Sequence, residues 1–445
     1  MRKIFILTIL FTAIVAQSAF AFLGFGWRDI KRGHAAPAAE LASKPLSLQE
    51  AYQLSLKQSE AIGIQAEEIG KAHARFFRAF DYFLPTAHFE MDRFYQDVGK
   101  DASGSDGITG DSRRRFVPTD KFVFHQPLFS GFKELAAIQG TGADKKEQHL
   151  RLKRAKELLF IDVMESYYEL LRARKDLAVL DETRKIMTDR LKELEGRVRL
   201  GRTKESDQLS SSADLKVIEA DWAETKAVET TLLNLFEFYI GQPLNDRPLE
   251  DSEMAETLKE LPVYLEKAKT RSDVQAEEQA DIVADKGVLA AQSDLIPKVS
   301  LDGNYYTKRT GFQSGTDWDV MLKFDVPIFE LGTTLGDIRE ATATKAAASL
   351  MARQTRRIAE RDIKDAYERL HTSELQEKSL GEAADATKQS YTLISDDYGH
   401  NLVNNLEVLD ALRRYQEIER RSNTASYERK KNFWRFKAAL GEIET

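Results

Sequence analysis

The residue types that most often catalyse reactions or bind metal ions are scattered along this chain without the spacing that such chemistry needs. None of the 445 residues is a cysteine, so thiolate metal sites, a cysteine nucleophile and disulfides are excluded. The histidines show no metal-ligand spacing among themselves. They are His34, His73, His88, His125, His149, His371 and His400. The G-x-S-x-G, H-E-x-x-H, P-loop and G-x-G-x-x-G patterns are also missing, and we therefore expect no enzyme activity, no metal and no cofactor.

The composition excludes further classes of function. Hydrophobic residues make up 42% of the chain and charged residues 31%. This provides a core but carries too much charge for a polytopic helical membrane protein. The net charge of -7 makes a phosphate-binding surface improbable, so no nucleic-acid partner is expected.

The first residues have the pattern of a cleaved export signal. Arg2 and Lys3 precede the apolar run 4–15, and Ala19 and Ala21 occupy the two positions that a signal peptidase inspects. We predict a signal peptide over 1–21 and, behind it, an N-terminal extension over 22–46. An uncleaved anchor is the weaker alternative, because the run is short for ~30 Å of hydrocarbon. No later run is long enough for a membrane-spanning helix, so the mature chain either stays soluble or enters a membrane as β-strands.

Two long stretches without proline, 128–242 and 328–445, indicate long helices. They are copies of one unit, since an offset of 200 residues superimposes identical residues in both. The superimposed pairs include Pro127 and Pro327, Tyr167 and Tyr367, Leu209 and Leu409, and Phe236 and Phe436. A repeat of this length predicts a duplicated, domain-sized element. We predict a first repeat over 47–243, a linker over 244–262 and a second repeat over 263–445.

Apolar residues in the first stretch follow the period of a coiled coil. The two predicted core rows are Val163, Leu170, Leu177, Leu191 and Val198, and Ala173, Leu180, Met187 and Leu194. Gly201 interrupts this pattern, which predicts an antiparallel helical hairpin with its tip near Gly201. The corresponding tip of the second repeat is expected near Gly399 and two residues longer.

Immediately before each hairpin the apolar period changes to two, which predicts β-hairpins at about 86–127 and about 298–327. Each pair is bridged by a polar, glycine-containing loop, 97–115 and 307–316. The alternation fits a half-buried hairpin of a soluble domain as well as strands with one lipid-facing side. Four strands are fewer than the ~8 of the smallest known barrels, so strands that enter a membrane must be pooled among several chains.

The order of signal, helix, strand pair and long helical hairpin, given twice, resembles the TolC-like outer membrane efflux protein family over nearly the whole mature chain. The segment 126–131 (QPLFSG) looks like the family's strand-to-helix turn, and 326–329 (VPIF) looks like its second copy. The segments 84–85 and 296–297 are similar to its helix-to-strand junctions. The predicted strand–helix junctions are therefore Pro85, Pro127, Pro297 and Pro327.

The resemblance implies a mainly α fold with a small β part, in which a homotrimer pools its strands as a 12-stranded outer membrane β-barrel above an α-helical periplasmic tunnel. It implies an exit duct for tripartite efflux or type I secretion. Its expected partners are outer membrane lipid, a periplasmic adaptor and, through the adaptor, an inner membrane pump. The alternative is a soluble periplasmic coiled-coil adaptor or scaffold, in which one hairpin flanked by compact β-domains would be expected. The transported substrate leaves no signature.

The resemblance also selects candidate residues at the periplasmic end. Asp207, Glu407 and Asp410 fall where the tunnel narrows, and a threefold ring of carboxylates would attract cations. The alternative is a solvated helix face, in a chain with 72 acidic residues. The predicted hairpin tips, where an adaptor would dock, are marked by Gly201, Arg202 and Gly399.

Overall fold

A computed structural model describes residues 44–97, 116–245, 247–253, 258–310, 314–328, 331–400 and 402–443. The predicted signal peptide, most of the extension 22–46 and nearly all of the loop 97–115 lie outside these ranges. The chain divides into two compact units, 1–45 with 245–248, and 46–244 with 249–445. In the first unit, Arg247 Nε donates to the carbonyl oxygen of Lys44 at 2.6 Å. The larger unit, called the main unit below, contains all the helices and strands that follow.

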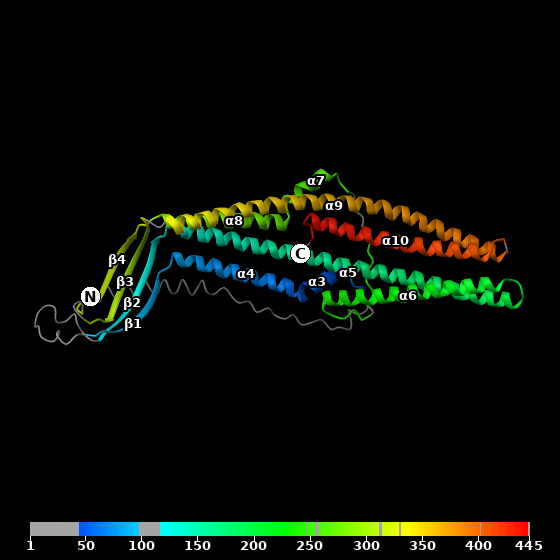
Figure 1. Cartoon of the computed structure of the whole chain (residues 1–445), viewed down its shortest axis with the longest axis horizontal. Helices are drawn as coiled ribbons and strands as arrows, with labels where there is room; N and C mark the ends of the chain where they lie inside the picture. Colours follow the sequence, from blue (N-terminus) through cyan, green and yellow to red (C-terminus); the bar gives the residue numbers. More distant parts are fainter. Residues whose placement is uncertain are drawn as a thin grey trace, which may run out of the picture. The chain divides into compact units, whose positions relative to one another are not determined.

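The main unit is mostly helical with one small antiparallel sheet, which confirms the predicted fold class (Figure 1). Its first repeat contains α3 (Leu48–Gln58), α4 (Glu60–Ala79), η1 (Phe80–Tyr82), β1 (Thr86–Tyr95), β2 (Phe116–Phe129), α5 (Lys133–Arg199) and α6 (Glu205–Ile240). α7 (Leu261–Leu265) begins within the predicted linker and runs into the second repeat. The second repeat then contains η3 (Glu266–Thr270), α8 (Ser272–Gln292), η4 (Ser293–Leu295), β3 (Lys298–Lys308), β4 (Trp318–Asp325), α9 (Leu331–Gly399) and α10 (Asn405–Ala439). Among the described residues, no helix is both apolar and long enough to span a bilayer.

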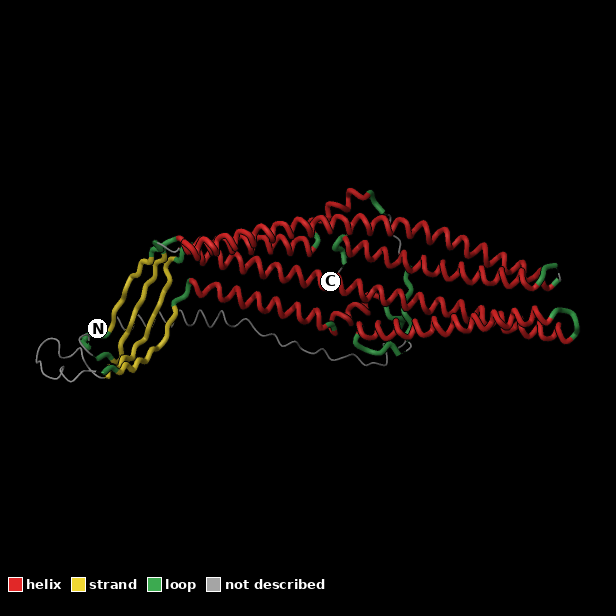
Figure 2. Tube along the Cα trace, viewed as in Figure 1, coloured by secondary structure: helices red, strands yellow, loops and turns green. Residues whose placement is uncertain are grey.

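The four strands form a single sheet in the order β1-β2-β3-β4, with every neighbouring pair antiparallel. Both predicted strand pairs are therefore present, and β2 continues two residues past the predicted end at 127. The pairing of β2 with β3 was not predicted, and it joins the two repeats. Figure 2 shows the strands together at one end of the main unit, with the long helices leading away from them.

The sheet has one aromatic face and one polar face. Directly paired residues form an aromatic row across all four strands, Phe89, Phe122, Tyr305 and Trp318. Their exposed fractions are 47%, 42%, 43% and 64%, so the row is largely uncovered. On the opposite face polar side chains pair across strands, as where Asn304 Nδ2 donates to Asp319 Oδ1 at 2.8 Å. In soluble antiparallel sheets the apolar face usually packs on a core. The aromatic face of this sheet does not.

The core of the main unit keeps the duplication that the sequence shows. The rings of Tyr167 and Phe236 lie 5.9 Å apart, and those of Tyr367 and Phe436, each 200 residues later, lie 6.0 Å apart. In both repeats this contact joins the outgoing long helix to its return helix. The residues that are identical at the 200-residue offset therefore occupy equivalent packing positions in the two repeats.

The predicted core rows of α5 are correct in part. Ala173, Leu180, Met187 and Leu194 are buried, as expected. Leu177 and Leu191, however, are only half-buried. The neighbouring polar row is buried in their place, and it consists of Asp176, Thr183 and Arg190. An α-helix drifts by ~20° per heptad relative to a strict seven-residue repeat, which moves the buried row by one residue along a helix this long.

Candidate functional site at the hairpin tips

Both helical hairpins end in turns of the same length. α5 ends at Arg199 and α6 begins at Glu205, while α9 ends at Gly399 and α10 begins at Asn405. The prediction of a longer second tip is therefore wrong, because the 200-residue offset holds through both turns. Gly201 lies in the first turn with a φ of 68°, which glycine adopts at little cost. Gly399 is instead the last helical residue, and position 401, the equivalent of Gly201, lies outside the described residues.

Hydrogen bonds close the two turns in the same way. The backbone nitrogen of Arg202 donates to the carbonyl oxygen of Arg197 at 2.9 Å, and Leu402 donates to Asp397 at 2.9 Å. The tips are therefore equivalent structures, although their sequences differ.

The three carboxylates selected from the sequence lie close to these turns. Asp207 is in the first turn of α6 and accepts a hydrogen bond from Thr203 Oγ1 at 3.0 Å. Glu407 forms a capping box with Asn404, the residue that precedes α10. Asp410 lies about one turn later, where its exposed carboxylate is 3.4 Å from Arg413. In the described part of the chain, no hydrogen bond or ion pair joins these three carboxylates to one another.

A buried polar cluster beside the carboxylates joins the two hairpins. Arg190 of α5 donates from Nε and Nη2 to Asn405 Oδ1 of α10, at 2.9 and 2.7 Å. Asn405 Nδ2 donates to the carbonyl oxygen of Asp207 at 3.3 Å and to Ser211 Oγ of α6 at 3.2 Å. The guanidinium of Arg190 also lies 4.1 Å from the ring centroid of Tyr398 in α9. We call Arg190, Ser211, Tyr398 and Asn405 the tip junction.

The tip junction contains a positive charge that forms no ion pair in the described structure. Arg190 is 9% exposed and Asn405 is 6% exposed. Burial lowers the pKa of the Arg190 guanidinium below its ordinary value. A buried charge is costly unless hydrogen bonds satisfy it, so the arrangement depends on the Asn405 amide oxygen. Sequence analysis missed this pair, although the N-x-x-E spacing of Asn404 and Glu407 is a readable signal for the start of α10.

A cavity of about 450 Å³ opens between α5, α6 and α10. Its lining includes apolar Met187 and Leu412 and a charged pair, in which Arg413 of α10 donates to Asp214 of α6. Oδ2 of Asp214 is buried and has no hydrogen-bond partner. The Asp214–Arg413 pair is thus a second polar link between the two hairpins.

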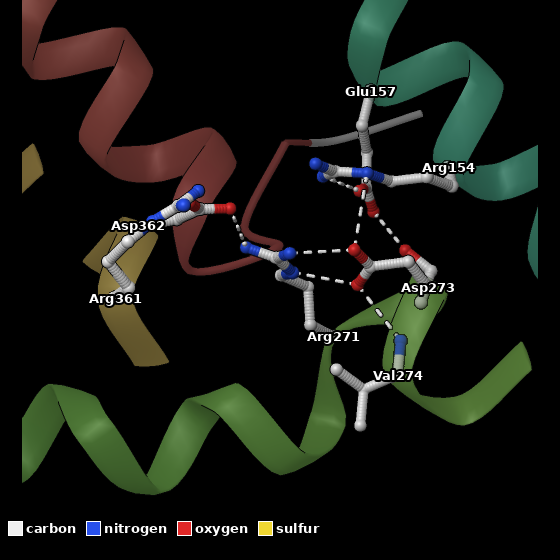
Figure 3. Close-up of polar contacts among 8 residues, drawn as sticks. Arg154, Glu157, Arg271, Asp273, Val274, Arg361 and Asp362 are labelled. Carbon is white, nitrogen blue, oxygen red and sulfur yellow. Dashed lines mark hydrogen bonds and ion pairs between the residues drawn. The ribbon is translucent and has the colours of Figure 1, made fainter. Parts of the chain in front are cut away.

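A separate charged network joins the two repeats at Arg271, which is 2% exposed (Figure 3). Its Nε and Nη2 donate to the two carboxylate oxygens of Asp273, each at 2.7 Å, and its Nη1 donates to Asp362 of α9 at 3.2 Å. Arg154 of α5 pairs with Glu157 at 3.0 Å and lies 3.8 Å from Asp273. Burial opposes ionisation of Asp273, but the hydrogen bonds from Arg271 and the charge of Arg154 outweigh it and lower the pKa of that carboxyl.

The four selected prolines occupy unequal positions. Pro85 and Pro297 directly precede β1 and β3, and Pro327 follows β4. Pro127 lies inside β2, opposite Ser300 and beside a register shift. Pro127 therefore distorts the end of a strand, and the turn into α5 comes after it.

That turn requires glycine. Gly131 has a φ of 69°, and a Cβ atom at this position would lie 2.5 Å from the carbonyl oxygen of Ser293. Ser293 opens η4, just before β3 of the second repeat. Gly131 therefore permits the β2–α5 turn to touch the corresponding connection of the other repeat.

Comparison with solved structures identifies the class to which this fold belongs. The chain superposes on the CmeC outer membrane channel of Campylobacter jejuni with a TM-score of 0.76 and 17% identity, covering 89% of this chain and 86% of that one. The outer membrane protein VceC of Vibrio cholerae gives 0.77 and 18%, covering 88% and 96%. The MtrE outer membrane channel of Neisseria gonorrhoeae, in its open state, gives 0.73 and 20%, covering 88% of each chain. The fold is that of outer membrane channels.

Family comparison adds a match to the sequence itself. Residues 264–442, which run from within α7 to just past α10, match the family described as outer membrane efflux protein. No curated protein matches the chain significantly. The resemblance to TolC-like outer membrane efflux proteins is thus confirmed, by sequence over the second repeat and by fold over both.

Proposed function

We propose that the protein is an outer membrane exit duct, a passive channel of a tripartite efflux or type I secretion system. The observation that carries this proposal is the sheet, whose aromatic face is exposed and whose opposite face is polar. A soluble half-buried hairpin would cover a core with the aromatic face. Burial in lipid stabilises each large apolar side chain by about 1.5–3 kcal/mol, so the row from Phe89 to Trp318 favours a membrane environment.

The edges of the sheet support assembly from several copies. β1 and β4 each have one partner strand in the described structure, which leaves one side of each unpaired. In lipid every backbone group needs a hydrogen-bond partner, so these edges would pair with neighbouring copies. We propose the homotrimer and 12-stranded barrel that the family resemblance implies. A soluble adaptor would carry one hairpin and separate β-domains, whereas this chain has two hairpins and one shared sheet.

The periplasmic gate is proposed at the tips. Asp207, Glu407 and Asp410 would form a carboxylate ring in the trimer, and the tip junction with the Asp214–Arg413 pair would hold the two hairpins together in the closed state. Opening would separate the hairpins and break these contacts. The turns at Gly201, Arg202 and Gly399 would receive a periplasmic adaptor, which connects the duct to an inner membrane pump.

Fractionation and bilayer recording test this proposal. The duct should be recovered from washed outer membranes only with detergent, and the purified protein should form trimers that conduct ions in planar bilayers. Recovery in osmotic-shock fluid would favour the soluble adaptor. Replacing the three carboxylates with Asp207→Asn, Glu407→Gln and Asp410→Asn should reduce cation preference. An unchanged selectivity would remove the carboxylate ring while leaving the duct itself in place.

A further inference from the structure

A cavity of about 340 Å³ lies beside the Arg271 network and is lined mainly by charged side chains. It opens between α5, α9 and α10, and we call it the arginine cavity. Five of its lining residues are arginines, namely Arg154, Arg271, Arg361, Arg369 and Arg435. Two others are acidic, Asp362 and Asp365. We propose that the arginine cavity binds a small anion that carries several phosphate or carboxylate oxygens.

The carboxylates that neutralise three of these arginines lie outside the lining. The pairs are Arg154 with Glu157 at 3.0 Å, Arg271 with Asp273 at 2.7 Å and Arg435 with Glu165 at 2.9 Å. None of the three carboxylates is among the residues that line the cavity. Figure 3 shows Asp273 and Asp362 on opposite sides of the Arg271 guanidinium. The lining itself is therefore positive, with five guanidiniums and two carboxylates.

Hydrogen-bond donors outnumber acceptors in the arginine cavity. Each guanidinium has five N–H donors in a planar fork that matches the oxygens of a phosphate or a carboxylate. Asp362 accepts from Arg271 at 3.2 Å and from Arg361 at 2.6 Å, so two guanidiniums share one carboxylate. Asp365 lies 3.9 Å from Arg361, which is too long for a hydrogen bond. Arg369 makes no hydrogen bond or ion pair with the residues that the structure describes. An anion with several oxygens would supply the missing acceptors.

The deeper guanidiniums are shielded from water. Arg271 is 2% exposed, and the side chain of Arg154 is 20% exposed. Hydrogen bonds between ionised groups are stronger in such surroundings than in bulk water, because the effective dielectric constant is lower. The C-terminal end of α10 also reaches the cavity. Backbone nitrogens beyond Ala439 already donate to the carbonyl oxygens of Ala438 and Lys437, so these two acceptors are occupied.

The arginine cavity joins the two repeats. A bound anion would contact α5 of the first repeat and α9 and α10 of the second, and would strengthen the junction that the Arg271 network already forms. Small side chains, those of Ala366, Ala438 and Ala439, line part of the remaining wall. They leave more room than a single phosphate ion needs, which favours an anion with two or more charged groups. This inference does not depend on the proposed transport function.

Calorimetric titration of the full-length, detergent-purified protein tests the arginine cavity, with sodium pyrophosphate and sodium citrate used separately in a phosphate-free buffer. We expect at least one of them to bind, with one anion per chain. Arg369→Gln should weaken binding by about tenfold, because it removes a charged donor, and this exposed side chain is not needed for folding. Asp365→Asn should strengthen binding, because it removes negative charge from the lining.

Arg353→Gln is the matched control, since it changes an exposed arginine of the same helix that does not line the cavity. It should bind as the wild type does. Saturable binding of neither anion to the wild type, or equal affinities of Arg369→Gln and Arg353→Gln, would overturn the proposal.

A second measurement uses only the wild-type protein and so does not depend on the variants folding. Phenylglyoxal modifies accessible guanidiniums, and mass spectrometry locates the modified residues. The anion that binds should protect Arg361 and Arg369 and leave Arg353 reactive. Equal modification of Arg369 with and without the anion would contradict the site.

Discussion

Replacing Asn405 by alanine tests whether the tip junction holds the two hairpins together. The substitution removes the acceptor of two Arg190 hydrogen bonds and both donor contacts of Asn405 to α6. Leaving a buried polar group unsatisfied costs about 1–3 kcal/mol, and more for a charged group. Because Arg190 is 9% exposed, we expect a cost of about 3 kcal/mol to the closed arrangement. At ~1.4 kcal/mol for each factor of ten, the open state should gain about 100-fold in population.

Single-channel recording of Asn405→Ala in planar bilayers measures this shift as an increase in the time spent open. Asn404→Ala is the matched control, since it removes a helix cap worth about 1 kcal/mol without releasing Arg190. Arg190→Met should act more weakly, because it leaves only the neutral amide oxygen of Asn405 without a partner. The double variant Arg190→Met, Asn405→Leu should restore part of the closure, because the buried charge is gone and only Ser211 Oγ and the carbonyl oxygen of Asp207 lose their donor. If Asn405→Ala opens no more often than Asn404→Ala, the tip junction does not hold the gate.

Three further predictions concern the charged network at Arg271 and the turn between β2 and α5. Arg271→Met leaves the carboxylates of Asp273 and Asp362 without their shared guanidinium. Breaking such a pair costs about 3–5 kcal/mol, and the partial exposure of both carboxylates places the expected loss near 3 kcal/mol, measured by denaturant unfolding. Folding lowers the pKa of the Asp273 carboxyl. The stabilisation that this carboxylate gives is therefore complete above the ordinary carboxyl pKa of about 3.9 and is lost as the pH falls through the pKa of the folded state. The melting temperature of the wild type should thus fall more steeply with acid than that of Asp273→Asn. Gly131→Ala should destabilise by more than ~1–2 kcal/mol, because it adds a clash to a left-handed φ, whereas Gly336→Ala, in open space on α9, should not destabilise. Equal melting of the two glycine variants would contradict the account of the β2–α5 turn.

Much of the fold could be predicted because the sequence states it twice. Identical residues at one offset, such as Tyr167 with Tyr367, revealed the duplication before any contact was known, and the period of the apolar residues distinguished helix from strand. The local strand pairs followed from the same period. The pairing of β2 with β3 could not be predicted, because it joins segments that are separated by an entire helical hairpin.

The candidate site was harder to predict for a related reason. The carboxylates at 207 and 407 were located through family resemblance, while the contact between Arg190 and Asn405 crosses from one hairpin to the other. A polar residue in a buried row also contradicts the apolar pattern used to find that row, so the period of the apolar residues does not predict that Arg190 is buried.

The number of strands has a consequence for assembly. Four strands that alternate in direction end with β4 running opposite to β1, so a copy added at either edge meets its neighbour antiparallel, as every pair inside the chain already does. Any number of copies satisfies this condition, so the direction of the strands does not determine how many subunits assemble. In the proposed assembly, the packing of long helices from neighbouring copies would help to set the number of subunits. Substitutions that enlarge or reduce the side chains at those contacts should then change that number while the strand pairing is kept.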